Sequence, residues 1–402
     1  MVKENTMKQT DIGLFPEDWT VYKIEDLTPK NIKYTIVDGP FGSNLKTIHY
    51  RKKGIPIITS GYVTGGKFYA EEYLYVDKEK FQQEKRSSVQ AGDIVMAKIG
   101  ERCGASAILP LNHIESILSG NALKIKINKE KFSSDLIAQI LYNDYLRGNL
   151  NQLRTVGAQP AISMANLKIY KIPLPALPEQ EAIAEALSDA DVWMESLEKL
   201  IAKKRLIKLG AMQELLKPKE DWEVKKLGEV CEIIMGQSPL SEFYNNSGIG
   251  LPLVQGNADI ENRKTIIRNY TSQITKRGKI GDIIMSVRAP VGEIATATFD
   301  CCLGRGVCAF RTESKFLYHL LIYKEDDWGQ FSTGSTFDSV NSNQIRDLEI
   351  NIPKSLTERY RVEKILSDMD AELESLATQL VKARQIKQGM MQELLTGRTR
   401  LT

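Results

Sequence analysis

The segment Leu187-Ser-Asp-Ala-Asp-Val-Trp-Met-Glu-Ser-Leu197 returns later in the chain as Leu366-Ser-Asp-Met-Asp-Ala-Glu-Leu-Glu-Ser-Leu376. The two copies share one offset (366 − 187 = 179), and 17 of the 30 residues from 187 to 216 are identical at 366 to 395. A repeat at a fixed offset dictates the architecture of a chain, because each copy forms the same structural unit. The sequence therefore predicts one long helix that occurs twice.

Both copies carry an apolar seam with the alternating three- and four-residue spacing of a coiled coil. The seam positions are Leu187, Ala190, Met194, Leu197, Ile201 and Lys204 in the first copy, and Leu366, Met369, Leu373, Leu376, Leu380 and Ala383 in the second. Pro178 suits the first turn of one helix, and Ser355-x-x-Glu358 is a capping box for the other. From Pro178 to Leu216 the helix would be roughly 58 Å long at ~1.5 Å per residue. A helix of this length with one seam needs a partner, and a pseudo-two-fold axis makes the two copies antiparallel.

A second repeat marks the start of each half. Glu17-Asp18-Trp19 recurs as Glu220-Asp221-Trp222, so each half comprises a tryptophan-marked start, a variable region and the repeated helix. The variable regions contain short alternating strands and frequent turn signals. In one of these strands, residues 123–127, lysines alternate with Leu and Ile, which predicts a basic outer face.

The predicted fold class is α+β, with two globular domains separated by two long antiparallel coiled-coil helices and an internal pseudo-two-fold repeat. The boundaries are expected at residues 1–175 for the first globular domain and 176–217 for the first helical segment. The second globular domain is expected at residues 218–353 and the second helical segment at 354–402.

The composition indicates an ordinary soluble protein, with 42% hydrophobic residues, 26% charged residues and a net charge of +3. No apolar run approaches the ~18 residues of a membrane span, and the first ten residues lack a signal-peptide core. We therefore expect a cytoplasmic location and no membrane partner. The five cysteines form no C-x-x-C pair and the three histidines are scattered, so neither a disulfide framework nor a metal site is expected.

Motifs for catalysis are missing from the sequence. The glycine-rich stretch 61–68 has Phe68 where a phosphate-binding loop needs a hydroxyl residue for magnesium. No Gly-x-Gly-x-x-Gly opens a βαβ unit, and nothing places a nucleophile beside a base. The sequence therefore indicates a binding protein without a cofactor of its own. Its weak positive charge permits nucleic-acid binding through local patches.

Further motifs follow one another in a specific order. Asp38-Gly-Pro-Phe-Gly-Ser-Asn-Leu-Lys46 and Met235-Gly-Gln-Ser-Pro239 lie near the start of each variable region. The others are Ser286-Val-Arg-Ala-Pro-Val-Gly292, Gly157-Ala-Gln159, and Asn166-Leu followed by Pro173-Leu-Pro175 and Pro178-Glu-Gln180. Together with the duplicated helix, these motifs resemble the specificity subunit of a type I restriction-modification enzyme over nearly the whole chain. The second half departs from the pattern at Leu356-Thr-Glu-Arg359, which affects only the local turn.

The resemblance implies two target recognition domains that bind double-stranded DNA, each recognising one half of a split target. Because the two variable regions differ in sequence, the target is expected to be asymmetric. It implies no catalysis in this chain, which would direct adenine methylation and restriction by partner subunits in a defence against foreign DNA. Two methyltransferase subunits would bring S-adenosylmethionine. Restriction subunits, a further partner that the resemblance allows, would bring ATP-driven translocation and cleavage with Mg²⁺.

Candidate DNA-binding residues are the polar or basic side chains in the glycine-marked loops, since Arg pairs with guanine and Asn or Gln with adenine in the major groove. In the first half these are Ser43, Asn44, Lys46, Ser60, Lys98, Arg102 and Gln159; in the second they are Gln237, Ser238, Gln255, Asn257, Arg288, Arg305 and Thr336. Each could instead contact phosphate or, like Ser43 and Asn44, satisfy the backbone of a turn. Candidate partner-binding residues recur on both helices: Asp189, Glu195 and Lys203, with Asp368, Glu374 and Lys382.

Two other classes of protein remain open from the residues alone. One is a DNA methyltransferase or nuclease whose catalytic centre has no recognisable motif. The other is a protein-binding scaffold with two heads. Methyl transfer by the isolated chain would indicate the first, and the absence of salt-sensitive DNA binding would indicate the second.

Overall fold

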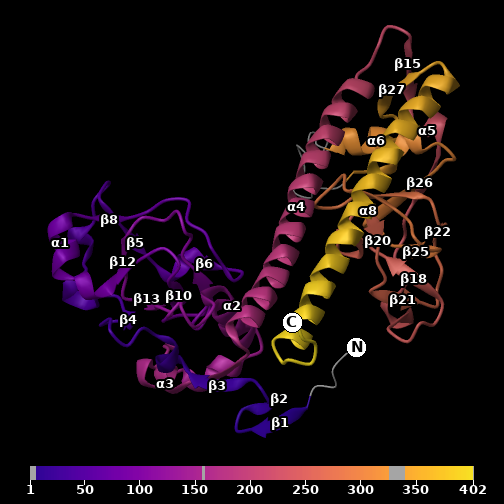
Figure 1. Ribbon diagram of the computed structural model, residues 1–402. Coiled ribbons are helices and arrows are strands. Elements are labelled where there is room, and N and C mark those ends of the chain that lie inside the picture. Colours follow the sequence, from indigo (N-terminus) through magenta and orange to yellow (C-terminus); the bar gives the residue numbers. More distant parts are fainter. Residues whose placement is uncertain (1–5, 156–158, 326–339, 402) are drawn as a thin grey trace. The chain divides into compact units, whose positions relative to one another are not determined.

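The two repeated segments form the helices α4 (Leu177–Leu215) and α8 (Leu356–Leu394), each 39 residues long (Figure 1). The computed structural model describes residues 6–155, 159–325 and 340–401. The chain divides into two compact units, one made of residues 1–196 with 380–402 and the other of residues 197–379. Each unit therefore contains part of α4 and part of α8.

The helices run antiparallel within each unit. In the first unit, Asp191 of α4 accepts from Nζ of Lys387 at 2.6 Å, while Glu179 at the start of α4 pairs at 2.6 Å with Arg400, beyond the end of α8. In the second unit, Lys208 pairs with Asp370. Asp370 lies 179 residues after Asp191 (370 − 191), and Lys387 lies 179 residues after Lys208 (387 − 208), so the two interhelical ion pairs are copies of each other. The predicted antiparallel pair with internal repeat is confirmed.

Burial along the helices follows the predicted seam. Leu187, Leu197 and Ile201 are buried on α4, and Leu366 and Leu376 are buried on α8. The remaining seam positions are buried or half-buried, while most residues between them are exposed. The alternating spacing therefore gives the apolar face by which the helices pack.

The first globular domain, called here the first head, extends from β3 to β14 and contains two four-stranded sheets (Figure 1). One sheet has the order β11-β10-β13-β4 and the other β8-β5-β12-β9. Its strands are β3 (Thr20–Lys23), β4 (Ile36–Asp38), β5 (Ile55–Ile58), β6 (Val63–Thr64), β7 (Lys67–Phe68), β8 (Tyr75–Val76), β9 (Ser88–Val89), β10 (Ile94–Ala97), β11 (Ser106–Ile108), β12 (Ser116–Leu118), β13 (Ala122–Ile125) and β14 (Lys171–Leu174). Its helices are α1 (Lys78–Gln83), α2 (Ser134–Leu146) and α3 (Met164–Ile169), and the hairpin of β1 (Met7–Thr10) and β2 (Gly13–Pro16) precedes it.

The second head, from β15 to β27, repeats this topology despite its different sequence. The order β24-β23-β26-β16 matches the first sheet and β21-β18-β25-β22 matches the second, and β18 is parallel to β25 as β5 is to β12. The second head has a further parallel pair, β20 with β24. Its strands are β15 (Trp222–Lys226), β16 (Glu232–Met235), β17 (Tyr244–Asn245), β18 (Leu251–Val254), β19 (Ile260–Glu261), β20 (Lys264–Thr265), β21 (Asn269–Thr271), β22 (Arg277–Gly278), β23 (Ile283–Ser286), β24 (Ile294–Thr296), β25 (Cys301–Leu303), β26 (Val307–Arg311) and β27 (Glu349–Pro353). Its helices are α5 (Leu227–Val230), α6 (Lys315–Tyr323) and α7 (Ser342–Arg346).

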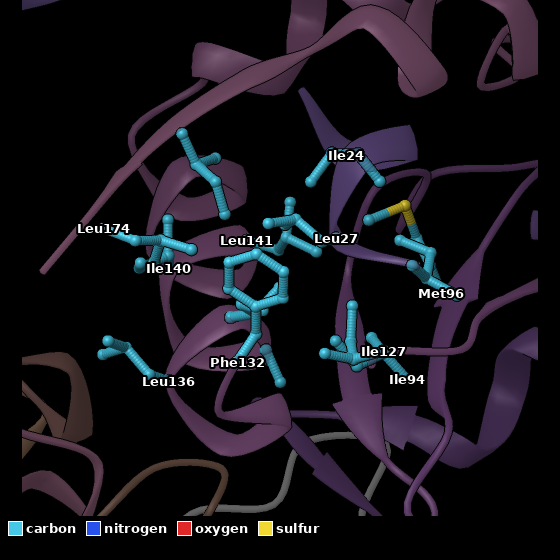
Figure 2. Close-up of a cluster of buried hydrophobic side chains, with 14 of the residues drawn as sticks. Ile24, Leu27, Ile94, Met96, Ile127, Phe132, Leu136, Ile140, Leu141 and Leu174 are labelled. Carbon is cyan, nitrogen blue, oxygen red and sulfur yellow. The ribbon is translucent and has the colours of Figure 1, made fainter. Parts of the chain in front are cut away.

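The main core of the first head lies between its first sheet and α2. Figure 2 shows Leu136 and Ile140 of α2 facing Ile94 and Met96 of β10, with the ring of Phe132 between them. The same cluster extends to Leu394 and Leu395 at the end of α8, which belong to this unit. The head is therefore anchored on the helix ends by a continuous apolar core.

One expectation for this sheet was wrong. Lys124 on β13 was predicted to face solvent, but its side chain is buried and its ammonium group donates to the carbonyl oxygen of Ser88. The reason is that the second sheet covers this face: Ile58, Val89 and Leu118 pack against Ala122 of the same strand. Burial lowers the pKa of Lys124, because the charged form loses hydration.

Candidate nucleic-acid interface

Four chain segments meet at one edge of the first head: the loop after β4, the ends of β5 and β10, and the turn between β12 and β13. The backbone N–H of Lys98 donates to the carbonyl of Asn121 at 2.8 Å, and that of Ser60 donates to Oδ1 of Asn121 at 3.2 Å. Gly39 donates to the carbonyl of Ala122 at 3.0 Å, and a Cβ there would lie 2.1 Å from the carbonyl oxygen of Ser119. The predicted residues Ser60 and Lys98 are thus brought together.

The loop after β4 carries the next group of predicted residues. Lys98 pairs with Asp38, and its Nζ lies 4.2 Å from the ring centroid of Phe41. Ser43 and Asn44 belong to the short 3-10 helix η2 (Gly42–Asn44), and Lys46 follows it. The side chains of Asn44 and Lys46 are exposed, as contact with a ligand requires.

Arg102 and Gln159 lie beside the end of β10. Nη1 of Arg102 donates to Oγ1 of Thr64 at 3.0 Å. The N–H of Gly100 donates to the carbonyl of Pro160 at 3.2 Å, which places Gln159 next to the loop that carries Arg102. Both side chains are exposed. The predicted residues of the first head therefore come from separate segments of the sequence but share one edge.

The second head builds the same edge with different side chains. Val287 donates to the carbonyl of Gly306 at 2.9 Å, as Lys98 does to Asn121. Gln237 donates through its backbone to Leu303 at 2.8 Å, and Ser238 Oγ accepts from the backbone of Arg305 at 3.1 Å. These bonds bring Gln237, Ser238 and Arg305 together.

The remaining candidates of this head differ in their surroundings. Nε2 of Gln255 donates to the hydroxyl of Tyr244 at 2.6 Å, and the amide of Asn257 donates to Glu293, so both amides have partners within the head. Arg288 is exposed directly after Val287. Thr336 lies outside the described residues.

The predicted residues left out two contributors to the edge of the first head, Asn121 and Phe41, although Phe41 belongs to the Asp38–Lys46 motif. The side chain of Asn121 accepts from Ser60 and from Ser119 Oγ, and the exposed ring of Phe41 packs at the same point. The available signal was a pair of turns between apolar strands, Ser119-Gly-Asn121 in one half and Gly304-Arg-Gly306 in the other. Their equivalence depends on strand pairing, which sequence spacing does not supply.

Two of the predicted partner-binding residues contact the heads of this chain. Glu195 on α4 pairs with Lys67 of β7 at 3.2 Å, and Glu374 on α8 pairs with Lys264 of β20. The other four, Asp189, Lys203, Asp368 and Lys382, are exposed on the helices. Each head thus carries an equivalent lysine on its small hairpin that contacts the equivalent glutamate of the repeated helix.

Within residues 6–155, 159–325 and 340–401, no group of three or more His, Cys, Asp or Glu is placed to hold a metal ion. Burial raises the pKa of the Cys231 and Cys301 thiols to about 12, which keeps them protonated at neutral pH. In the same ranges no helix is long and apolar enough to cross a membrane.

Comparison with known proteins identifies the family. A family model described as the type I restriction modification DNA specificity domain matches residues 16–204 and again residues 219–383. The chain belongs to this family of DNA specificity subunits. It is 30% identical to the putative type I restriction enzyme MjaX specificity subunit of Methanocaldococcus jannaschii, over 99% of this chain and 98% of that protein.

Solved structures agree on the fold. The type I restriction-modification S subunit from M. genitalium matches with a TM-score of 0.61 at 17% identity, over 94% of this chain and 96% of that one. A chain from a structure of the assembly and conformational transition of a type I restriction-modification system matches with a TM-score of 0.57 at 22% identity, over 96% and 99%. Because the DNA specificity family model matches both halves of the chain, this protein is a DNA-recognition subunit that acts in a complex with other subunits, and it is not the catalytic subunit of that complex.

Proposed function

We propose that this specificity subunit recognises a bipartite, asymmetric DNA target and thereby directs adenine methylation and restriction by its partner subunits. The observation that carries the proposal is the pair of equivalent edges. Both heads have one strand order, yet at equivalent positions they present different side chains. Base edges in the major groove are distinguished by the side chains that meet them. Two unlike edges therefore predict two unlike half-sites.

The proposed target recognition domains are residues 1–175 and 218–353, and the helical segments are residues 176–217 and 354–402. A helix of 39 residues is about 58 Å long at 1.5 Å per residue. That length supports half-sites separated by one helical turn of DNA or more, ~34 Å between centres. The bases between the half-sites would form a spacer of unspecified sequence.

The proposed complex contains two methyltransferase subunits, one for each copy of the repeated helix. Its support is that exposed Asp189 and Lys203 recur as exposed Asp368 and Lys382, although the apolar seam alone would hold the helices together. S-adenosylmethionine, ATP and Mg²⁺ would be bound by the partner subunits and not by this chain. The complex would act in the cytoplasm, where the five free thiols of this chain stay reduced.

The experiment is co-expression of this chain with the methyltransferase encoded in the same genome, followed by sequencing of methylated adenines. The proposal expects one split motif with two different halves. It also expects purified complex to bind that duplex with an affinity that falls steeply with salt. Methylation at a continuous or palindromic motif, or methylation that does not require this chain, would contradict it.

A further inference from the structure

Each head has one equivalent contact between a large and a small residue, but the large residue occupies opposite positions of that contact in the two heads. In the first head Phe41 packs on Gly120, where an added Cβ would lie 2.8 Å from Cδ1 of the ring. In the second head Arg305 lies above Ser238, whose Oγ accepts the backbone N–H of Arg305 at 3.1 Å. The large residue thus comes from the loop after β4 in the first head and from the turn between β25 and β26 in the second.

Backbone hydrogen bonds establish this equivalence. Gly39 donates to Ala122 in the first head as Gly236 donates to Val307 in the second, both at 3.0 Å. Phe41 and Ser238 each follow two residues after these glycines (41 − 39 = 238 − 236 = 2). Ser119 donates to Ile58 and Gly304 donates to Val254, both at 2.8 Å. Gly120 and Arg305 are the next residues in each turn.

We propose that the large side chain at this point contacts a base in each head, with Phe41 taking the methyl group of a thymine and Arg305 taking the O6 and N7 acceptors of a guanine. The inference rests on the proposed function and deepens it, because it assigns one base type to each half-site. Thymine is the base that presents a methyl group in the major groove, and guanine presents two adjacent acceptors there.

Phe41 offers an apolar surface. Its side chain is 44% exposed although it is a large hydrophobic residue. The ammonium of Lys98 lies over the ring at 4.2 Å and is itself neutralised by Asp38. What remains for a ligand is therefore the uncharged ring, which suits an apolar group better than a phosphate.

Arg305 offers a charged donor on a fixed turn. A Cβ on Gly304 would lie 2.9 Å from Cα of Gln255, and a Cβ on Gly306 would lie 2.1 Å from the carbonyl oxygen of Gln255. Both positions that flank Arg305 therefore require glycine, and the side chain of Arg305 is exposed between them. By contrast, Arg311 pairs with Asp282. Within the described parts of the chain no carboxylate pairs with Arg305, so its guanidinium is available for bidentate recognition.

The first test uses base analogues with the purified complex of this chain and its methyltransferase. Deoxyuridine replaces each thymine of the first half-site in turn, and 7-deazaguanine replaces each guanine of the second. One deoxyuridine should weaken binding about fourfold, the effect of one buried methyl group. One 7-deazaguanine should weaken binding about tenfold through the lost acceptor. Phe41→Ala should abolish the first sensitivity only, and Arg305→Ala the second only.

Arg346→Ala is the matched control, because this exposed arginine lies at the end of α7, beside Gly228 of α5, and not at the edge. It should keep both sensitivities. A second variant transplants the contact: Phe41→Ser with Gly120→Arg removes the ring that blocks position 120 and leaves the Pro40 carbonyl oxygen at 3.0 Å as the nearest neighbour. This variant should lose the thymine requirement and gain a guanine requirement in the first half-site. An unchanged second half-site in the methylated motif reports that the chain is folded.

Analogue sensitivities that persist in both alanine variants would overturn the inference, as would a wild-type complex indifferent to every deoxyuridine and 7-deazaguanine. Either result would leave the proposed function standing, provided the wild type methylates a split motif. Failure of the wild type to methylate a split motif would instead overturn the proposed function.

Discussion

Replacing Arg400 by alanine is expected to destabilise the first unit by about 3 kcal/mol. Arg400 follows α8 and binds two carboxylates at once. Its Nε and Nη2 donate to Glu179 at 2.6 and 2.7 Å, and its Nη1 and Nη2 donate to Asp18 at 2.9 and 2.6 Å. Glu179 is only 6% exposed, so removing its cation leaves a buried carboxylate without charge compensation, which costs up to ~3 kcal/mol. Asp18 is 63% exposed and adds at most ~1 kcal/mol.

The assay is hydrogen exchange of the β3 segment, which follows Trp19 and pairs with β14 in the first unit. A loss of about 3 kcal/mol in the opening free energy should accelerate exchange there roughly 100-fold, at 1.4 kcal/mol per tenfold. Lys30→Ala is the control, since Lys30 contacts Asp26 at 3.3 Å with both side chains largely exposed. Its expected effect is below about 0.5 kcal/mol. Equal exchange in the two variants would refute the argument that burial of Glu179 sets the magnitude.

Three further changes test other parts of the account. Insertion of four helical residues near Lys217 should lengthen the spacer of the methylated motif by about two base pairs, since four residues add ~6 Å; an unchanged spacer would contradict this. Reversal of charge at Asp189 together with Asp368 should weaken co-purification of the methyltransferase while circular dichroism stays unchanged, and undiminished two-to-one assembly would remove the basis for that interface. The hydrogen bond from Lys219 holds the pKa of the Glu358 carboxyl below its usual value of about 4.5. The ionised carboxylate therefore stabilises the folded state above about pH 4.5, and this stabilisation is lost as the pH falls through the lowered pKa. Urea midpoints should therefore fall more between pH 5 and pH 3 in the wild type than in Glu358→Gln, and parallel profiles would argue against the pair.

The helices could be predicted from the sequence because their signal is local. The spacing of the apolar seam, which includes Leu187 and Leu197, can be read within a window of about 30 residues. The duplication repeats the same pattern from Leu366 onward. Strands β10 and β23 carry a local signal too, since each is an apolar run that follows a Gly-Asp pair, at Gly92 and at Gly281. These features depend on neighbours in the sequence and need no knowledge of tertiary pairing.

The topology of the heads could not be predicted in this way. Most strands have two to four residues, and the parallel partner of β5 is β12, with Ile57 opposite Ile117, 60 residues later (117 − 57). Alternation also failed at Lys124, because a second sheet covers the face that the pattern assigned to solvent. The contact of Phe41 with Gly120 depends on the same long-range pairing, so its importance emerged only from the structure.

The central claim is that each head independently recognises one half-site. Exchanging residues 20–165 for the same region of a homologue with a different target tests it most directly, with sequencing of methylated adenines as the measurement. The account predicts a hybrid motif in which one half-site changes to that of the homologue while the other half-site and the spacer stay as in the wild type. A chimera that alters both half-sites, or that methylates the wild-type motif unchanged, would contradict it.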